Sequence, residues 1–127
     1  MSSARRWTPS VAWSCVILTA TSVPGALLRN APVFPGADKV AHAILYGVLG
    51  FLAWHAISRD WPASRPWLAS ALRLVAAIAV FAAGDEWHQQ FIPGRGAEAA
   101  DWVADVAGAS VGLTISRTTP WRRGLLS

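Results

Sequence analysis

Charged and polar side chains that could take part in chemistry gather in three short segments of this sequence. They are Asp38, Lys39, His42 and Tyr46; then Asp85, Glu86, His88, Gln89 and Arg95; and finally Asp101 and Asp105. Carboxylates and imidazole can move protons, a guanidinium can bind an anion, and carboxylates with imidazole can hold a divalent cation. No serine or cysteine lies within these segments, so the sequence offers no nucleophile beside them.

The spacing within each segment places these residues on common helix faces. Asp38, His42 and Tyr46 recur every four residues, so a helix would hold them in one stripe. The same spacing separates Asp85 from Gln89, Glu86 from Gln90, and Asp101 from Asp105. Each segment is therefore expected to present its polar groups together rather than around the whole helix.

Four apolar stretches must position these segments, at about residues 11–28, 40–57, 67–91 and 99–115. Their lengths suit helices that cross a bilayer, which need about 20 residues each, and they lack the alternation of a strand. Hydrophobic residues make up 54% of the 127 residues and charged residues only 14%, against about 25% in a typical soluble domain. The sequence predicts an all-α membrane protein, one domain over residues 1–127 that forms a bundle of four transmembrane helices.

The basic residues predict the orientation of this bundle. Those that flank one set of helix ends are Arg5, Arg6, Arg59, Arg65, Arg117, Arg122 and Arg123, whereas Arg29, Lys39 and Arg95 flank the other set. The positive-inside rule then places both termini in the cytoplasm of a multi-pass bacterial inner-membrane protein. The bilayer is its expected partner. The basic residues never form a continuous block, so the net charge of +4 does not indicate nucleic-acid binding.

The first apolar stretch also has features of a cleaved signal peptide, with Arg5 and Arg6 before it and small residues near Ala20. However, the twin arginines lack the rest of a Tat signal. Cys15 comes too early in the run for a lipobox. We therefore interpret this stretch as a retained first helix.

Helical rise places polar groups of three helices at similar depth. Asp85 and Asp105 each lie twelve residues from an arginine at the cytoplasmic end of the same stretch, which corresponds to about 18 Å. Tyr46 lies at about 20 Å by the same arithmetic. A carboxylate at such depth needs a partner or a proton. Arg95, which follows the helix-breaking Pro93, is the expected counter-ion, and Lys39 is the second candidate.

Small residues recur every four positions in the last apolar stretch, at Ala100, Ala104, Gly108 and Gly112. Such a ridge lets another helix approach closely. We expect it to pack within the bundle rather than between two copies of the chain. That contact would also turn Asp101 and Asp105 toward the interior.

These segments resemble the signature of the VanZ-like family. The run Asp85-Glu86-Trp-His88-Gln89-Gln-Phe-Ile-Pro93-Gly94-Arg95, followed by Asp101-Trp-Val-Ala-Asp105-Val-Ala-Gly108, is similar to the family's D-E-x-H-Q-x-F-x-P-G-R and D-x-x-x-D-x-x-G. Asp38-Lys39-Val-Ala-His42-Ala-Ile-Leu-Tyr46 is similar to its D-K-x-x-H-x-x-x-Y element, and Thr21-Ser22-Val-Pro24-Gly25 to a further segment. Together the matches cover roughly residues 15–115. Many relatives carry Asn at the position of Asp105.

The resemblance implies a protein of the bacterial cell envelope with a link to low-level resistance to the glycopeptide teicoplanin. It attaches no reaction to the family as a whole. The resemblance therefore specifies the architecture more closely than the chemistry.

Two functions of different class remain open. In the first, a non-catalytic envelope protein binds a lipid-linked, cell-wall-related or glycopeptide ligand, or a partner protein, at its outer mouth. In the second, an enzyme acts on a lipid-borne phosphate or cell-wall precursor. Arg95 and Lys39 would then clamp an anion while a carboxylate or His42 moves a proton. No cofactor is expected beyond a Mg²⁺ or Mn²⁺ ion in this second case. A proton or ion pathway is disfavoured, because the cytoplasmic half carries no continuing polar chain.

The predicted functional cluster consists of His42, Tyr46, Glu86, Gln89, Arg95, Asp101 and Asp105. Asp85 and His88 are secondary members. Asp38 and Lys39 are secondary as well and are interpreted as structural, since aspartate caps helix N-termini and both lie at the interface. The alternative for the whole group is a self-satisfied polar network that fixes the register of the helices.

Overall fold

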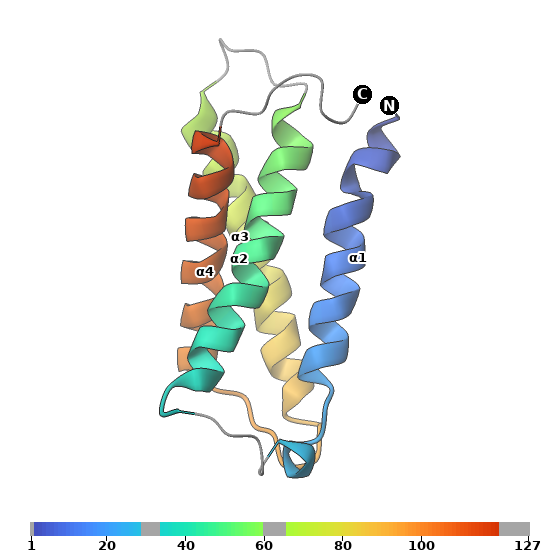
Figure 1. Ribbon diagram of the computed structural model, residues 1–127, viewed down its shortest axis with the longest axis vertical. Helices are drawn as coiled ribbons and strands as arrows, with labels where there is room; N and C mark the ends of the chain where they lie inside the picture. Colours follow the sequence, from blue (N-terminus) through green and yellow to red (C-terminus); the bar gives the residue numbers. More distant parts are fainter. Residues whose placement is uncertain (1, 29–33, 60–65, 120–127) are drawn as a thin grey trace.

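The computed structural model describes residues 2–28, 34–59 and 66–119 of the chain. Across these residues it contains no strand, and its helices are α1 (Ser3–Thr21), the short 3₁₀ turn η1 (Gly25–Leu27), α2 (Ala37–Ser58), α3 (Trp67–Gln89) and α4 (Ala99–Thr118). The four α-helices run side by side along the long axis of the molecule (Figure 1). The predicted all-α, four-helix fold is thus confirmed.

The bundle has two distinct ends. η1, the start of α2 and the connection between α3 and α4 lie together at the bottom of Figure 1, whereas α1 begins and α4 ends at the top. The backbone N–H of Gly25 donates to the carbonyl oxygen of Pro93 at 2.9 Å, which ties η1 to the α3–α4 connection. We call the end formed by η1, the first turns of α2 and α4, and residues 90–98 the loop end.

The first helix differs most from its predicted range. α1 begins at Ser3 and ends at Thr21, whereas the apolar pattern predicted about residues 11–28. It ends early because Pro24 has no N–H to donate and restricts the residue before it. It begins early because arginine is a good helix former, so the helix includes Arg5 and Arg6. The prediction from hydropathy had left these two residues outside the helix. The bounds of the other three helices differ from the predicted ones by at most three residues.

α2 and α4 pack with their backbones in close contact. A side chain at Gly108 would overlap the carbonyl oxygen of Ala43, and one at Gly112 would overlap that of Gly47. The contact is reciprocal, because a side chain at Gly50 would overlap the carbonyl oxygen of Ala109. The small-residue ridge therefore packs within the bundle, as predicted.

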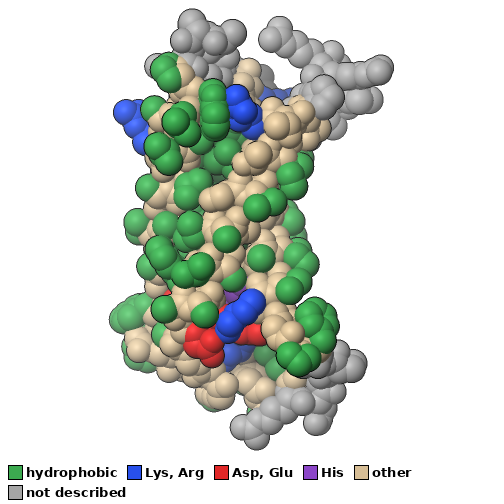
Figure 2. Space-filling model, turned by 90° about the vertical axis from the view of Figure 1, so that its left-hand side faces the viewer, with side chains coloured by type: hydrophobic (Ala, Val, Ile, Leu, Met, Phe, Trp, Pro, Cys, Tyr) green, Lys and Arg blue, Asp and Glu red, His purple; other side chains and the backbone are tan. Residues whose placement is uncertain are grey.

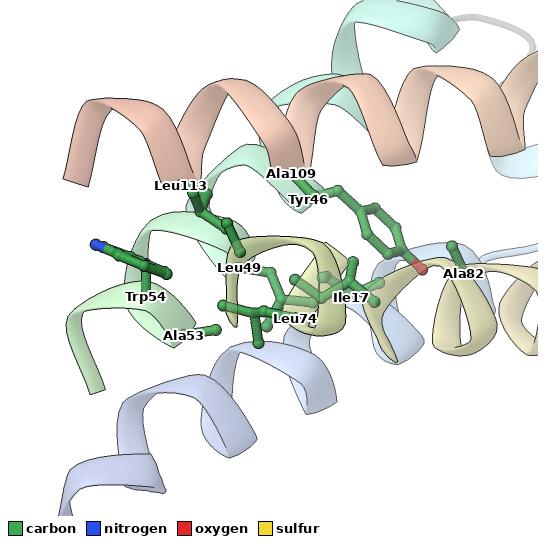
Figure 3. Packing of buried hydrophobic residues seen from close by; sticks show 11 residues of the cluster. Ile17, Tyr46, Leu49, Ala53, Trp54, Leu74, Ala82, Ala109 and Leu113 are labelled. Carbon is green, nitrogen blue, oxygen red and sulfur yellow. The ribbon is translucent and has the colours of Figure 1, made fainter. Parts of the chain in front are cut away.

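The apolar core lies between all four helices and includes the aromatic ring of Tyr46. Ile17 of α1, Leu49 of α2, Leu74 of α3 and Leu113 of α4 are buried. The ring of Tyr46 extends from α2 toward Ala82 of α3 (Figure 3) and is fully buried. Its hydroxyl therefore needs a partner inside the bundle.

The outside of the bundle is unusually apolar. Exposed large hydrophobic side chains occur on every helix, among them Val11 and Val16, Ile44, Leu72 and Val80, Val103 and Val111. Figure 2 shows hydrophobic side chains spread over the middle of one face, with charged side chains toward the two ends. Among the described residues, α2 and α3 are long and apolar enough to cross a membrane, with mean hydropathies of 1.6 and 1.8.

Candidate functional site

Most of the predicted site residues come together at the loop end. The first turns of α2 and α4 and the last turns of α3 supply them, because α2 begins, α3 ends and α4 begins at this end. Acidic and basic side chains gather there in Figure 2, with a histidine behind them. His42, Glu86, Gln89, Asp101 and Asp105 are all buried, at 6% exposure or less.

Lys39 bridges α2 to the start of α4. Its ammonium nitrogen lies 2.6 Å from Oε2 of Glu98 and 2.6 Å from Oδ1 of Asp101. Asp38 is a more distant partner at 3.5 Å and is exposed. Lys39 is therefore the counter-ion of the buried Asp101 carboxylate.

His42 lies between two pairs of carboxylates. Its Nδ1 is 2.7 Å from Oδ1 of Asp105 and 3.8 Å from Oε1 of Glu86. Its Nε2 is 3.8 Å from oxygens of both Asp38 and Asp101. The buried imidazole thus has two acids on each side, one pair inside the bundle and one pair toward its end. Either triplet, Asp38–His42–Asp101 or His42–Glu86–Asp105, has the composition and closeness to hold a metal ion.

Glu86 is held by hydrogen bonds from two directions. Its Oε2 accepts the backbone N–H of Glu98 at 3.1 Å, and its Oε1 accepts from Nε2 of Gln89 at 3.2 Å. Asp105 differs, because its Oδ2 atom has no hydrogen-bond partner among the residues that the structure describes. Both oxygens of Glu86 therefore have hydrogen-bond partners, whereas Asp105 has a partner for one oxygen only among the described residues.

Asp85 belongs to a separate group deeper in the bundle. Its two oxygens accept hydrogen bonds from the hydroxyls of Thr21 at 2.7 Å and Tyr46 at 2.9 Å. This group joins α1, α2 and α3. Tyr46, predicted as a member of the functional cluster, therefore donates its hydrogen bond to Asp85.

Arg95 does not have the partner that the sequence predicted. Its guanidinium donates from Nε to the carbonyl oxygen of Val23 at 3.0 Å and from an Nη atom to that of Ala20 at 3.5 Å. The C-terminal end of a helix carries partial negative charge on its last carbonyl groups, which favours a cation at the end of α1. Lys39 rather than Arg95 is therefore the counter-ion at this end, and it pairs with Glu98 and Asp101.

A pocket of about 300 Å³ opens at the loop end beside these residues. Three carboxylate side chains line it, together with one guanidinium, one amide and several glycines. The lining residues are Gly25, Leu28, Asp38, Gln89, Gly94, Arg95, Gly96, Glu98 and Asp101. Three of its four charged side chains are therefore acidic and can only accept hydrogen bonds when ionised.

Two residues of these networks were missed in the sequence, and His88 lies outside the networks, as Arg95 does. Glu98, three residues before Asp101, is the N-cap of α4 and binds Lys39, and its spacing from Asp101 was the available signal. Thr21 gave no signal for its contact with Asp85, which depends on how α1 packs. The half-buried side chain of His88 has no hydrogen-bond or ion-pair partner within the described parts of the chain.

Comparison with known proteins identifies a family. The sequence model of the VanZ/LLP1 family matches residues 3–120, which include every helix described above. No curated protein and no solved structure matches the chain.

Proposed function

This chain belongs to the VanZ/LLP1 family, and we propose that it is a multi-pass protein of the bacterial inner membrane that binds a cell-wall-related ligand. The ligand would enter the pocket at the loop end, on the outer side of the membrane. Lipid-linked cell-wall precursors and glycopeptides of the teicoplanin type are the ligands that this proposal covers. Their capture would link the protein to glycopeptide resistance.

The exposed surface supports insertion of the whole bundle. α1 and α4 have 19 and 20 residues, so each is long enough to span most of a hydrocarbon core of about 30 Å. Both expose large apolar side chains, such as Val16 and Val111. A soluble monomer rarely exposes apolar surface over so much of its area. We therefore infer four membrane spans, although among the described helices only α2 and α3 qualify by hydropathy.

The observation that carries the binding proposal is the acceptor-rich pocket. Its volume of about 300 Å³ lies at the small end of the range for small-molecule sites, about 300–1,000 Å³. It would therefore hold one sugar ring or a short peptide segment rather than a whole glycopeptide. Carboxylates of Asp38, Glu98 and Asp101 favour hydroxyl, amide N–H and ammonium groups on that ligand.

A binding assay with a pocket-filling variant tests this proposal. Gly96 lines the pocket, and a side chain there would have open space around its Cβ. Gly96→Phe should fill the pocket and weaken binding of a lipid-linked precursor, measured by calorimetry in nanodiscs, by at least about tenfold. Gly84→Phe is the matched control, since Gly84 also has open space but lies on α3 away from the pocket. Equal affinity in both variants would contradict the proposal.

The buried arrangement of His42, Glu86 and Asp105 favours the enzyme as a second candidate. The specific observation is the 2.7 Å contact between His42 and Asp105 beside a third acid, which suits proton transfer. The predicted anion clamp is less favoured, because Lys39 already binds two carboxylates and Arg95 two carbonyls. Turnover of a lipid diphosphate that disappears in Glu86→Gln would favour the enzyme over a binding protein.

A further inference from the structure

We propose that Nδ1 of His42, Oε1 of Glu86 and Oδ1 of Asp105 form a binding site for a divalent transition-metal ion. The three residues each offer one ligand atom within 4.8 Å of the other two, and Nδ1 of His42 lies 3.8 Å from Oε1 of Glu86 and 2.7 Å from Oδ1 of Asp105. Metal–ligand bonds of about 2.0–2.2 Å place neighbouring donors roughly 3 Å apart. We call these three residues the buried triad. Side-chain shifts of about an ångström would therefore bring its ligand atoms around an ion.

The unpaired oxygen of Asp105 points independently to a cation. Asp105 is 0% exposed, and its Oδ2 accepts no hydrogen bond from the described residues. Burying such an atom is costly unless something compensates it. Among the described residues, His42 is the one basic group within 4 Å of Glu86 or Asp105. Two buried carboxylates thus share one imidazole, and a divalent cation would balance their charge.

The groups around the triad are those that support metal ligands. A metal-bound histidine usually faces a carboxylate with its other ring nitrogen, and ligating carboxylates are themselves hydrogen-bonded. Nε2 of His42 faces Asp38 and Asp101, each at 3.8 Å. Both oxygens of Glu86 accept hydrogen bonds, from Gln89 and from the backbone of Glu98. These contacts hold the imidazole and the Glu86 carboxylate facing each other.

The second triplet, Asp38, His42 and Asp101, is a poorer site. The ammonium group of Lys39 lies 2.6 Å from Asp101 and 3.5 Å from Asp38, so a cation already neutralises it. Asp38 is also exposed. The buried triad has no such ammonium group among the described residues.

The mixture of donors indicates which ions fit. Mg²⁺ and Ca²⁺ favour sites made of oxygen atoms alone, whereas imidazole favours transition metals and carboxylates suit Mn²⁺. One nitrogen and two carboxylate oxygens therefore favour Mn²⁺ or Zn²⁺. Mn²⁺ is the more useful probe because it is paramagnetic.

The test is binding of Mn²⁺ alone to the full chain in nanodiscs. Disappearance of the free Mn²⁺ signal in electron paramagnetic resonance measures affinity, and electron spin echo modulation detects a coordinated ¹⁴N nucleus. We expect binding with an imidazole nitrogen coupling in the wild-type protein. Absence of Mn²⁺ binding by the folded wild-type protein, or binding without this coupling, would overturn the proposal.

Matched variants assign the ligands. The chain has three histidines, so His42→Gln should abolish the nitrogen coupling while His55→Gln and His88→Gln keep it. Glu86→Gln and Asp105→Asn should weaken Mn²⁺ binding at least about tenfold, since even outer-shell partners contribute factors of 10–100. Glu98→Gln removes a carboxylate that does not belong to the triad and keeps the backbone N–H that Glu86 accepts. This variant should bind Mn²⁺ with the affinity of the wild-type protein. Retention of the coupling in His42→Gln, or equal weakening in Glu98→Gln and Glu86→Gln, would contradict the site.

This inference goes beyond the proposed ligand binding and can be tested apart from it. The experiment uses the ion without any cell-wall ligand. Gly96→Phe, which should block the pocket, leaves the triad unchanged and should keep Mn²⁺ binding. If the wild-type protein binds Mn²⁺ but no cell-wall ligand, only the proposed function is refuted. If it binds the ligand but not Mn²⁺, only the metal site is refuted.

Discussion

Neighbouring acids of α3 have different environments. Asp85 receives two hydroxyl hydrogen bonds from α1 and α2, whereas Glu86 faces the imidazole of His42 and the backbone of Glu98. Consecutive residues on a helix point about 100° apart, so they meet different neighbours. Asp85 is therefore interpreted as a structural link between helices, and Glu86 as part of the functional group.

Removal of the Thr21 hydroxyl should destabilise the protein. Thr21→Val leaves Oδ1 of the buried Asp85 without its donor, and interhelical hydrogen bonds in membranes contribute about 0.6–2 kcal/mol. We expect the free energy of unfolding, measured by denaturant titration in micelles, to fall by about 1–2 kcal/mol.

Thr19→Val is the control for this change. The exposed Thr19 hydroxyl donates to the carbonyl oxygen of Cys15 within the same helix, so its loss should change stability by less than about 0.5 kcal/mol. If both variants lose equal stability, the contact with Asp85 contributes nothing particular to the fold.

At the scale of helices, the close packing of α2 against α4 holds the site together. His42 and Asp105 lie on these two helices at 2.7 Å from each other. The glycine contacts of Gly108 with Ala43 and of Gly112 with Gly47 set how near the two helices come. A wider separation would part the imidazole from the carboxylate.

A side chain at Gly112 should therefore affect both stability and the site. In Gly112→Ala the new Cβ would overlap the backbone of Gly47, which cannot move without shifting α2. We expect a loss of about 1–3 kcal/mol, measured by the same titration, with a parallel loss of Mn²⁺ affinity.

Gly84→Ala tests whether the effect comes from packing. A methyl group at Gly84 of α3 would have no neighbouring side chain or other helix within 4 Å, and alanine favours a helix over glycine by about 1 kcal/mol. This variant should be as stable as the wild type or more so. A destabilised Gly84→Ala beside an unchanged Gly112→Ala would contradict the packing argument.

For the whole molecule, the distribution of basic residues between the two ends of the bundle predicts which end faces outward. α1 begins and α4 ends at the same end of the bundle, opposite the loop end (Figure 1). Arg5, Arg6, Arg59 and Arg117 are described and flank that end of their helices. Arg29, Arg65, Arg122 and Arg123, which also enter the predicted orientation, lie outside the described residues. By the positive-inside rule, the end with more basic residues faces the cytoplasm, so we predict that the loop end lies outside it.

Labelling of single cysteines in intact cells would establish the orientation. In a Cys15→Ala background, which removes the single native cysteine, Gly96→Cys should react with a membrane-impermeant maleimide. Ser2→Cys should react only after the cells are permeabilised. Both positions are exposed, so accessibility within the fold does not limit either reaction. Labelling of Ser2→Cys but not Gly96→Cys in intact cells would reverse the orientation and place the pocket in the cytoplasm.

The sequence by itself determined the helices, the shared faces of the polar residues and the small-residue ridge of α4. These features depend on local physics, because helical hydrogen bonds join residues four apart and fix which side chains share a face. The tertiary structure decided the partners. Arg95 was expected over the acids, but the bond between Gly25 and Pro93 brings it to the end of α1. Lys39 and Glu98 pair with each other instead. Which residues become partners depends on the course of the loops and on how closely the helices approach. Local sequence patterns determine neither.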